Sequence, residues 1–252
     1  MRILVCVKQI PDPANPSRFD PVTHRLVRTE DQILDDTDRY GVEMGLRLAE
    51  ASGGTVTLLS MGPVGRAQGI RQALAMGADQ AVMVEDEALE GADALTTARI
   101  LAAAARHTGF DLVICGTEST DGYSGVVPQM MAELLSVAAM TYATSVEVAD
   151  DQVTIHRQTS AGYDVVVSGL PAVVSVTAGV VEPRYPTFRG IMQAKRKPTE
   201  TLSADDLGIS ISIGQEVVAV SPAPEREAGV IAEDEGEGHL LIVEKLREVK
   251  VI

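Results

Sequence analysis

The sequence predicts an α/β fold in which a mostly parallel, twisted sheet carries helices on both faces. Apolar runs of strand length recur at residues 3–7, 56–59, 81–84 and 112–115, and helix-like sequence precedes each of the last three. These runs are continuously apolar, whereas strands that face water on one side alternate between apolar and polar residues. Such runs, separated by helices, indicate parallel strands that are buried on both faces.

The spacers between the runs have the periodicity of helices. Residues 37–51 place Tyr40 and Met44 on one helical face, and residues 92–106 place Leu95 on one face with other apolar side chains. In a sheet of this kind the ligand site normally lies beyond the carboxyl ends of the strands. We therefore expect the functional loops to follow the four apolar runs.

The pattern changes in the second half of the chain. Strand-like runs follow one another at residues 142–148, 152–158, 163–167 and 172–176, with short turns between them. This spacing predicts a β-meander that extends or flanks the parallel sheet. The next segment, residues 183–198, has little periodicity, and loops of that length in a compact domain are usually functional or disordered.

The C-terminal segment predicts an extended arm that ends in a short helix. It begins with two prolines and an acidic, glycine-containing stretch, and residues 239–249 then resume helical periodicity. We expect an α/β domain over residues 1–220 and an arm over residues 221–252. We predict that the helix of the arm packs on another chain, although the pattern alone fits folding back on its own domain equally well.

Composition argues against two classes of function. The 252 residues carry a formal net charge of -15, so the surface should repel nucleic-acid phosphates. No apolar run approaches the roughly 18 residues that a membrane span needs. The apolar run at the N-terminus is too short for a signal peptide, and Cys6 and Cys115 both lie in strand-like runs, which favours buried free thiols. We therefore expect a cytoplasmic protein with no nucleic-acid partner and no membrane insertion.

One polar loop lies where the sheet predicts a ligand site. Residues 116–125 (GTESTDGYSG) follow the run at 112–115 and precede a helix-like stretch, residues 127–135. Glycines let the backbone approach a ligand closely, and hydroxyl groups together with the N–H groups of a helix N-terminus can hold a phosphate. The loop matches neither a Walker A motif nor a GxGxxG fingerprint. An ordinary crossover loop in which Ser124 caps the helix fits the same residues.

No catalytic or metal-binding pattern emerges from the other residues. The four histidines lie far apart in the sequence without metal-ligand spacing, and no nucleophile elbow is recognisable. The pairs Asp35-Asp36 and Asp205-Asp206 stand at expected helix starts, where carboxylates interact favourably with the helix dipole. The residues by themselves therefore predict a nucleotide-binding α/β domain that carries a long basic loop and an arm, without chemistry of its own.

Several segments together resemble a known family. Residues 5–12 (VCVKQIPD), 73–79 (ALAMGAD) and 170–174 (LPAVV) carry part of the resemblance. The strongest part is the long loop, residues 182–198 (EPRYPTFRGIMQAKRKP), followed by DLG at residues 206–208. These stretches closely resemble the signature of electron-transfer flavoprotein beta subunits, and the similarity covers nearly the whole chain.

The resemblance implies a Rossmann-like domain in a heterodimer with a larger alpha subunit. The alpha subunit of the family carries the redox FAD, and the beta subunit binds AMP without redox duty. No metal site is expected. The cofactor-binding residues that the resemblance implies are Cys6, Asp35, Asp36, Thr37, Asp38, Met61, Gly116, Thr117, Glu118, Ser119, Thr120, Asp121, Gly122, Tyr123, Ser124, Gly125, Val126 and Val127.

The long loop, taken as residues 177–198, would be a recognition loop that docks partner dehydrogenases. An exposed Phe188 would enter a pocket of the partner while basic neighbours steer the encounter, and a buried core phenylalanine is the alternative. The family takes electrons from flavin-dependent dehydrogenases such as acyl-CoA dehydrogenases, in fatty acid oxidation, and passes them to a membrane quinone oxidoreductase. The partner-binding residues implied are Glu182, Arg184, Tyr185, Phe188, Arg189, Ile191, Met192 and Lys195.

The chain departs from the family pattern at three places. Asp121-Gly122 begins a loop with few acidic and amide side chains, and it resembles flavin-bifurcating relatives, whose beta subunit holds a second FAD in place of AMP and takes hydride from NADH. Gln158 replaces a common acidic residue near the flavin, and Asp35-Asp36 replaces Asn-Pro. Three hypotheses remain: an electron carrier, a bifurcating complex, and a non-redox nucleotide-binding regulator of the universal-stress type.

Overall fold

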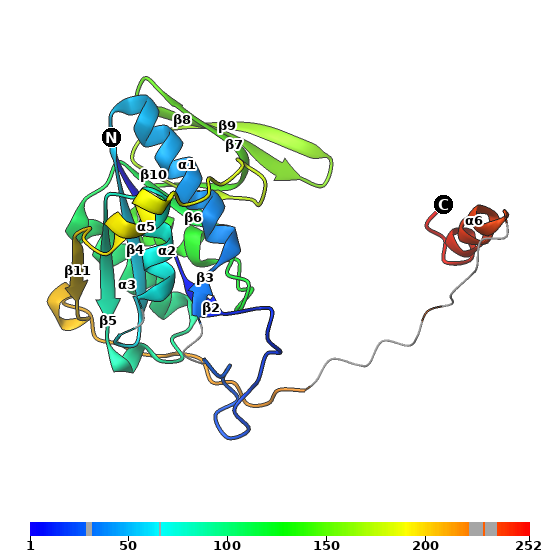
Figure 1. The fold of residues 1–252 in the computed structure, drawn as a ribbon, viewed down its shortest axis with the longest axis horizontal. Coiled ribbons are helices and arrows are strands. Elements are labelled where there is room, and N and C mark those ends of the chain that lie inside the picture. The colour runs from blue at the N-terminus through cyan, green and yellow to red at the C-terminus, as the bar shows by residue number, and fades with distance from the viewer. Residues whose placement is uncertain (29–31, 66, 222–228, 230–235) are drawn as a thin grey trace. The chain divides into compact units, whose positions relative to one another are not determined.

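The computed structural model describes residues 1–28, 32–65, 67–221, 229 and 236–252. The chain divides into two compact units, Met1–Val218 and Ala219–Ile252. The first unit contains the sheet and the second contains the C-terminal helix (Figure 1). Most of the stretch that the sequence predicts to be extended, residues 222–228 and 230–235, lies outside the described residues.

The main sheet has nine strands in the spatial order β11-β5-β4-β1-β6-β10-β7-β8-β9 (Figure 1). Neighbours from β11 to β7 run parallel, and β7, β8 and β9 pair antiparallel. A separate antiparallel pair joins β2 to β3. The strands are β1 (Arg2–Cys6), β2 (Gln9–Pro11), β3 (Gln32–Leu34), β4 (Thr55–Gly62), β5 (Gln80–Glu85), β6 (Leu112–Gly116), β7 (Ala138–Ala149), β8 (Gln152–Thr159), β9 (Gly162–Gly169), β10 (Ala172–Val176) and β11 (Thr199–Leu202). The four predicted parallel strands are confirmed.

Strand β10 departs from the predicted meander. It does not pair with β9 but lies between β6 and β7, parallel to both. All five of its residues are buried, as expected of a central strand that is covered on both faces. The meander consists of β7, β8 and β9, whose residues include many exposed positions.

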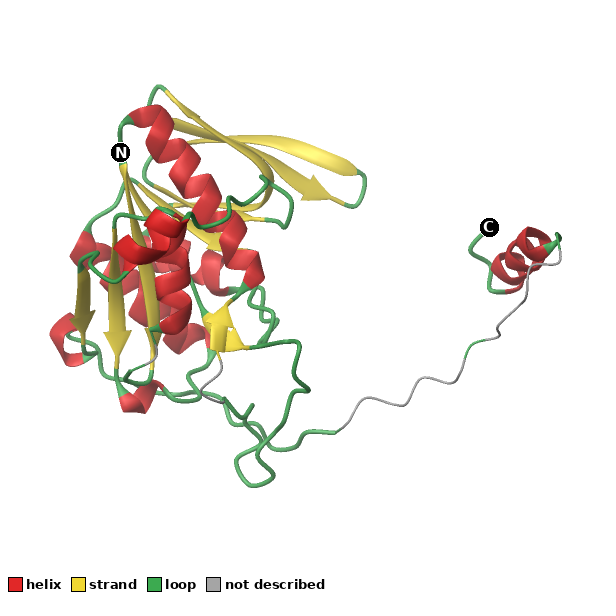
Figure 2. Ribbon diagram, viewed as in Figure 1, coloured by secondary structure: helices red, strands yellow, loops and turns green. Residues whose placement is uncertain are grey.

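Helices cover both faces of the sheet (Figure 2). Helices α1 (Asp36–Ser52), α2 (Gln68–Met76) and α5 (Phe188–Ala194) contribute to the core on one face, and α3 (Ala94–Thr108) and α4 (Val127–Leu135) contribute on the other. Two short 3-10 turns, η1 (Glu87–Leu89) and η2 (Asp205–Leu207), and helix α6 (Gly238–Glu248) complete the elements. The predicted helices at 37–51, 92–106, 127–135 and 239–249 are confirmed. The long loop differs from the prediction because it contains α5.

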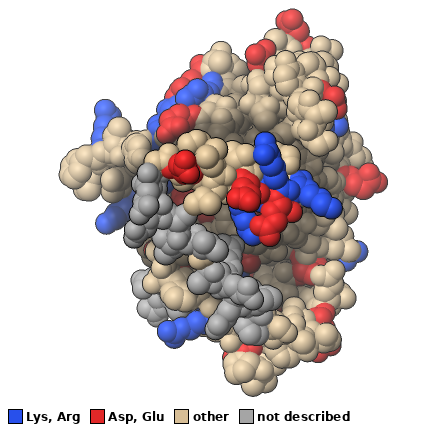
Figure 3. Space-filling view, turned by 90° about the vertical axis from the view of Figure 1, so that its right-hand side faces the viewer, with Lys and Arg blue, Asp and Glu red and all other residues tan. Residues whose placement is uncertain are grey.

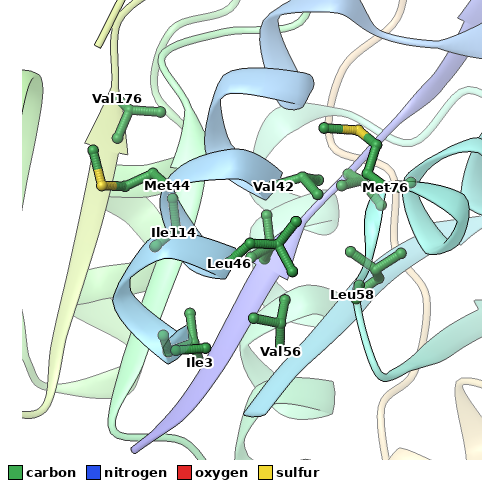
Figure 4. Close-up of a cluster of buried hydrophobic side chains, with 14 of the residues drawn as sticks. Ile3, Val42, Met44, Leu46, Val56, Leu58, Met76, Ile114 and Val176 are labelled. Atoms are coloured by element: carbon green, nitrogen blue, oxygen red, sulfur yellow. The ribbon is translucent and has the colours of Figure 1, made fainter. Parts of the chain in front are cut away.

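The alternation of side chains along β1 divides the core into two clusters. Ile3 and Val5 belong to the cluster under α1 and α2, whereas Leu4 belongs to the cluster under α3 and α4. Figure 4 shows the first cluster, where α1 side chains meet those of β1, β4, β6 and β10. Leu95, which was predicted to lie on the apolar face of α3, is not part of the second cluster, because it lies in the first turn of the helix and is 40% exposed.

Helix α1 approaches the sheet closely. A Cβ atom on Gly45 would lie 2.8 Å from Val5 Cγ2, so only glycine allows this distance. Figure 4 shows Val42, Met44 and Leu46 of α1 among the strand side chains. The close packing holds the middle of α1 against β1 and β6.

The surface and the cysteines agree with the composition. Both cysteines are buried and free, as predicted. On the face drawn in Figure 3, Lys and Arg side chains lie in small groups, several of them beside Asp or Glu, and form no broad basic surface. No helix in the described part of the chain combines the length and the apolarity needed to cross a membrane.

Candidate functional site

Three predicted segments meet at the carboxyl edge of the sheet. They are the end of β1, the start of α1 and the loop of residues 116–126, which we call the edge loop. Strands β1 and β6 are parallel neighbours, so the chain leaves both at the same edge. The sequence-predicted cofactor residues are therefore brought together in large part, and named contacts hold them.

Asp35 joins the edge loop to helix α1. Its side chain is fully buried, and Oδ1 accepts hydrogen bonds from Thr37 N at 3.0 Å and from Thr37 Oγ1 at 2.8 Å, which caps the helix. Its other oxygen, Oδ2, accepts from Thr120 N at 2.7 Å and from Thr120 Oγ1 at 3.1 Å. Asp35 therefore holds the backbone of the edge loop in place, and its own oxygens are occupied.

Asp121 forms a second connection, which involves two cations. Lys8 Nζ donates to Asp121 Oδ1 at 2.6 Å and to Ser119 Oγ at 3.3 Å, and Arg28 Nη2 donates to Asp121 Oδ2. Burial raises the pKa of Asp121, but the charges and hydrogen bonds of Lys8 and Arg28 outweigh it, so the pKa lies below its ordinary value. By themselves these three groups carry a net charge of one positive unit, and the carboxylates of Asp35 and Glu118 lie at the same loop.

Sequence reasoning missed both cations. A signal for Lys8 existed, because it follows β1 directly at the edge where the ligand site is expected. Arg28 lies 93 positions away from Asp121, and no local pattern connects the two residues. Lys8 therefore joins the candidate residues of this site.

Asp38 lies under the edge loop and is buried. Its Oδ2 accepts from Lys8 N at 2.6 Å, and a Cβ atom on Gly116 would lie 2.9 Å from Oδ1. Burial raises the pKa of Asp38 well above its ordinary value, and the neighbouring charge of Asp35 raises it further. The absence of a side chain at Gly116 thus leaves room for Asp38 at the end of β6.

Several predicted cofactor residues have their side chains elsewhere. The thiol of Cys6 packs in the second core cluster, 3.9 Å from Met131 Sδ, and Met61 packs against the same cluster. The side chain of Asp36 is 69% exposed and pairs with Arg39. A ligand would therefore meet Cys6 through its main chain.

The second half of the edge loop is open to solvent. Gly122, Ser124 and Val126 are exposed, and Tyr123 is 66% exposed with a left-handed φ of 47°. The N-cap of α4 is Val126, which makes no side-chain capping bond, so the alternative in which Ser124 caps the helix is wrong. The hydroxyls and main-chain N–H groups of this half provide donors for an anion.

One buried polar atom next to the edge loop lacks a partner. Gln129 lies in the first turn of α4, and its Oε1 is the one buried side-chain nitrogen or oxygen, among the described residues, without a hydrogen bond. An unpaired buried amide oxygen costs free energy unless a ligand or water pairs with it. Within the described residues no group of three or more His, Cys, Asp or Glu could hold a metal ion. The donors of the edge loop suit an anionic group of a ligand.

The predicted recognition loop exposes apolar side chains. Tyr185 is 82% exposed, Phe188 81%, Ile191 50% and Met192 56%. We call these four residues the docking patch. Phe188 is therefore not a core residue, and the alternative of a buried phenylalanine is wrong. Glu182, Arg189 and Lys195 are exposed around the patch.

Arg184 differs from the other predicted partner-binding residues because it pairs within the chain. Its Nε lies 2.7 Å from Glu43 Oε2, and its Nη1 lies 2.6 Å from Glu50 Oε1. The hydrogen bonds to Glu50 and Glu43 raise the pKa of Arg184 above its ordinary value. Arg184 is thus less available to a partner than its neighbours.

A second apolar surface lies on the edge strand β9. Tyr163, Val165 and Val167 alternate along the strand and are 59%, 60% and 52% exposed. They point to one face, and the ring of Tyr163 stacks on that of His156 at a centroid distance of 4.3 Å. Exposed apolar residues on an edge strand favour an interface with another chain.

Comparison with known proteins agrees with the predicted family. A family model described as the electron transfer flavoprotein domain matches residues 23–207. The electron transfer flavoprotein subunit beta of Mycobacterium leprae is 36% identical over 99% of each chain, and that of Thermoanaerobacterium thermosaccharolyticum is 35% identical over 100% of each. Subunit CarD of the caffeyl-CoA reductase-Etf complex of Acetobacterium woodii is 35% identical over 83% of this chain and 81% of its own. With its sheet, edge loop and recognition loop, this chain belongs to the family of electron transfer flavoprotein beta subunits.

Proposed function

We propose that this chain is the beta subunit of a cytoplasmic, heterodimeric electron carrier and that it holds AMP at the edge loop. The observation that carries the proposal is the edge loop itself, which Asp35 and Asp121 fix in place beside an unpartnered amide oxygen. Lys8 and Arg28 would balance the charge of the phosphate, and loop N–H groups would donate to it.

The role of this chain toward the flavin would be to form a wall of its site. FAD, carried mainly by the alpha subunit, would supply the redox chemistry when bound. The apolar face of β9 would pack on the alpha subunit and exclude water, because Tyr163, Val165 and Val167 form a row of exposed apolar side chains on one face of the strand. Gln158, which pairs with Tyr163 in the sheet, would then lie at the same interface.

The docking patch would bind the electron donors. An apolar patch with basic neighbours fits a partner that offers an apolar pocket with an acidic rim. Flavin-dependent dehydrogenases such as acyl-CoA dehydrogenases are the donors we propose, with a membrane quinone oxidoreductase as the acceptor. Family membership sets aside the non-redox regulator of the universal-stress type.

A second candidate function is that of a flavin-bifurcating complex, with a second FAD at the edge loop in place of AMP. The observation that favours it is the exposed, side-chain-poor half of the edge loop, where Gly122 and Gly125 leave the backbone open. Hydride from NADH would be accepted by that second FAD. The relative from Acetobacterium woodii is a subunit of a complex that includes a caffeyl-CoA reductase.

The deciding experiment is to coexpress this chain with its alpha subunit and to release the cofactors by denaturation. One FAD and one AMP per heterodimer are expected, as measured by chromatography of the released nucleotides. Two FAD and no AMP would instead support the bifurcating complex. Recovery of the chain without an alpha subunit and without nucleotide would contradict both proposals.

The role of the cations can be tested in the same assay. Lys8→Gln should lower the nucleotide content of the heterodimer, because it removes the cation that contacts both Asp121 and Ser119. FAD in the alpha subunit should not change. Arg2→Gln is the matched control, since Arg2 forms an exposed ion pair with Asp111 at the opposite end of β1. Equal nucleotide content in both variants would exclude Lys8 from the site.

The docking patch predicts a separate effect on electron transfer. Phe188→Ala should lower kcat/KM for a dehydrogenase donor by about tenfold or more, the usual effect of removing an apolar anchor from an interface. Nucleotide and FAD content should stay as in the unchanged protein. Phe19→Ala is the control, because Phe19 is also exposed, at 51%, but lies outside the recognition loop. An unaltered kcat/KM in Phe188→Ala would remove Phe188 from the docking role.

A further inference from the structure

The docking patch lies mostly on a helix that is too short to keep a fixed orientation without contacts to the rest of the domain. Three of its four residues belong to α5, which has only seven residues. An isolated helix of this length is unstable in water, so its position depends on contacts with the rest of the domain. Those contacts lie before the patch, inside α5 and directly after it.

The first contact is an ion-pair cluster on helix α1. Arg184 Nε and Nη2 donate to the two oxygens of Glu43 at 2.7 and 3.1 Å, and its main-chain N donates to Glu43 Oε2 at 3.2 Å. The same guanidinium donates to both oxygens of Glu50, at 2.6 and 3.2 Å. Arg47 Nε donates to Glu43 Oε1 at 2.9 Å. Glu43, Arg47 and Glu50 are thus spaced by four and three positions on one face of α1.

The burial of Glu43 makes this cluster different from a surface ion pair. Its side chain is 2% exposed, whereas that of Glu50 is 60% exposed. Burial by itself raises the pKa of Glu43, but the hydrogen bonds from Arg184 and Arg47 outweigh it and leave the pKa below its ordinary value. A buried carboxylate needs its cationic partners, so Glu43 holds Arg184 in one place.

The second contact attaches α5 to helix α2. A Cβ atom on Gly190 would lie 2.4 Å from the carbonyl oxygen of Ala75, so the two helices approach at a distance that only glycine permits. Ala194 is buried in the core, and Lys197 Nζ donates to the carbonyl oxygen of Leu74 at 3.0 Å. The segment is therefore fixed on both sides of the patch.

We propose that Arg184 is a positioning residue that holds the docking patch in its partner-binding orientation. It does so by joining the start of the recognition loop to Glu43 and Glu50, and it does not contact the partner. This inference rests on the docking function proposed above. Its physical basis is that a loop fixed before binding loses less conformational entropy in the complex, which strengthens binding without adding a contact. Within residues 184–197, all of which the structure describes, the exposed cations that can steer a partner are Arg189, Lys195 and Arg196.

The test compares variants of Arg184 and Glu50 in the coexpressed heterodimer. Two quantities are measured: hydrogen exchange of the amides of residues 184–196, and the KM and kcat for a dehydrogenase donor. Arg184→Ala should speed the exchange and raise KM by about tenfold, with kcat within about twofold, because a loosened patch binds less well but transfers normally once bound. Arg184→Lys should restore part of both effects.

Glu50→Gln provides a variant that will fold even if Arg184→Ala does not. It removes the exposed ion pair between Arg184 and Glu50 and leaves buried Glu43 paired with both arginines. The KM should therefore rise by only about two- to threefold. Arg71→Ala is the control, because Arg71 is an exposed arginine of α2 outside the patch. It should change neither quantity.

Three outcomes separate the two levels of the proposal. The positioning role of Arg184 would be overturned if hydrogen exchange were unchanged in both Arg184→Ala and Glu50→Gln. It would also be overturned if exchange became faster in Arg184→Ala while the KM stayed the same. An unchanged kcat/KM in Phe188→Ala would overturn the docking function, even if Arg184→Ala loosened the loop. Faster exchange and a higher KM together in Arg184→Ala, with a loss of transfer in Phe188→Ala, would support both.

Discussion

Asp121 in the edge loop and Glu43 beneath the recognition loop are two nearly buried carboxylates that each bind two cations. The side chain of Asp121 is 5% exposed and pairs with Lys8 and Arg28, and that of Glu43 is 2% exposed and pairs with Arg184 and Arg47. Both pKa values are lowered against the effect of burial. In both regions a carboxylate joins a loop to a part of the chain that is distant in sequence.

The two regions differ in what the fixed loop presents. The edge loop offers hydroxyls, main-chain N–H groups and half-exposed cations, which suit a small anionic ligand. The recognition loop offers four exposed apolar side chains, which suit the surface of a protein. In each region the ion pairs fix the position of the loop, and we propose that the other residues of the loop determine what it binds. The regions should therefore be separable by mutation.

The largest expected effect follows from removing Asp35. Asp35→Ala should lower the free energy of unfolding by about 3 kcal/mol, because it deletes the cap of α1, worth about 1 kcal/mol, and the buried hydrogen bonds to Thr120, worth about 2 kcal/mol. Urea unfolding measures this change. Asp36→Ala is the adjacent control and should change stability by no more than about 0.5 kcal/mol, because its ion pair is exposed.

The same variant tests whether the regions are separable. Nucleotide content should fall in Asp35→Ala, whereas the KM for a dehydrogenase donor should stay within about twofold, because the recognition loop is held by different ion pairs. A rise in KM equal to that of Arg184→Ala would show that the two regions act as one unit.

An effect of intermediate size concerns pH, where Asp38 and Asp121 should act in opposite directions. The folded-state pKa of Asp38 is raised, so its contribution to stability is present below the unfolded-state pKa of 3.8 and is lost as pH rises through the folded pKa. That of Asp121 is lowered, so its contribution is present above 3.8 and is lost as pH falls. The slope for either group is at most about 1.4 kcal/mol per pH unit.

Unfolding measured against pH in Asp38→Asn and Asp121→Asn checks this prediction. The stability of the unchanged protein relative to Asp38→Asn should decrease as pH rises, and its stability relative to Asp121→Asn should increase. A slope of the opposite sign in either comparison would show that the surroundings of that carboxyl group do not shift its pKa as we describe.

The smallest expected effect concerns the cations around the docking patch. Lys195→Ala combined with Arg196→Ala should slow association with a donor dehydrogenase a few-fold at low salt and hardly at all at high salt, because exposed charges steer encounters through a screened field. Stopped-flow measurement at several salt concentrations checks this. Stability should change by less than about 0.5 kcal/mol, since both side chains are exposed. A salt-independent loss would indicate direct contacts instead of steering.

Much of the fold could be predicted because the signals were local. Continuous apolar runs predicted β1, β4, β5 and β6, and apolar spacing predicted α1, α3 and α4. Strand β10 was predicted as a strand, but its position between β6 and β7 was not predicted, because an apolar run does not indicate which strands it pairs with. Helix α5 was missed because it has only seven residues and contains a glycine, so the helical spacing of Phe188, Ile191 and Met192 was too short a signal to predict a helix.

The sequence by itself determined the parallel sheet, the position of the edge loop at its carboxyl edge and the presence of an apolar segment in the recognition loop. Each of these depends on residues that are close together in the chain. The tertiary structure decided that Arg28 pairs with Asp121, 93 positions away, and that Arg184 pairs with Glu43, 141 positions away. Such pairs form only when packing brings distant segments together and buries the carboxylate. Their charges do not select a partner until the fold has removed the water between them.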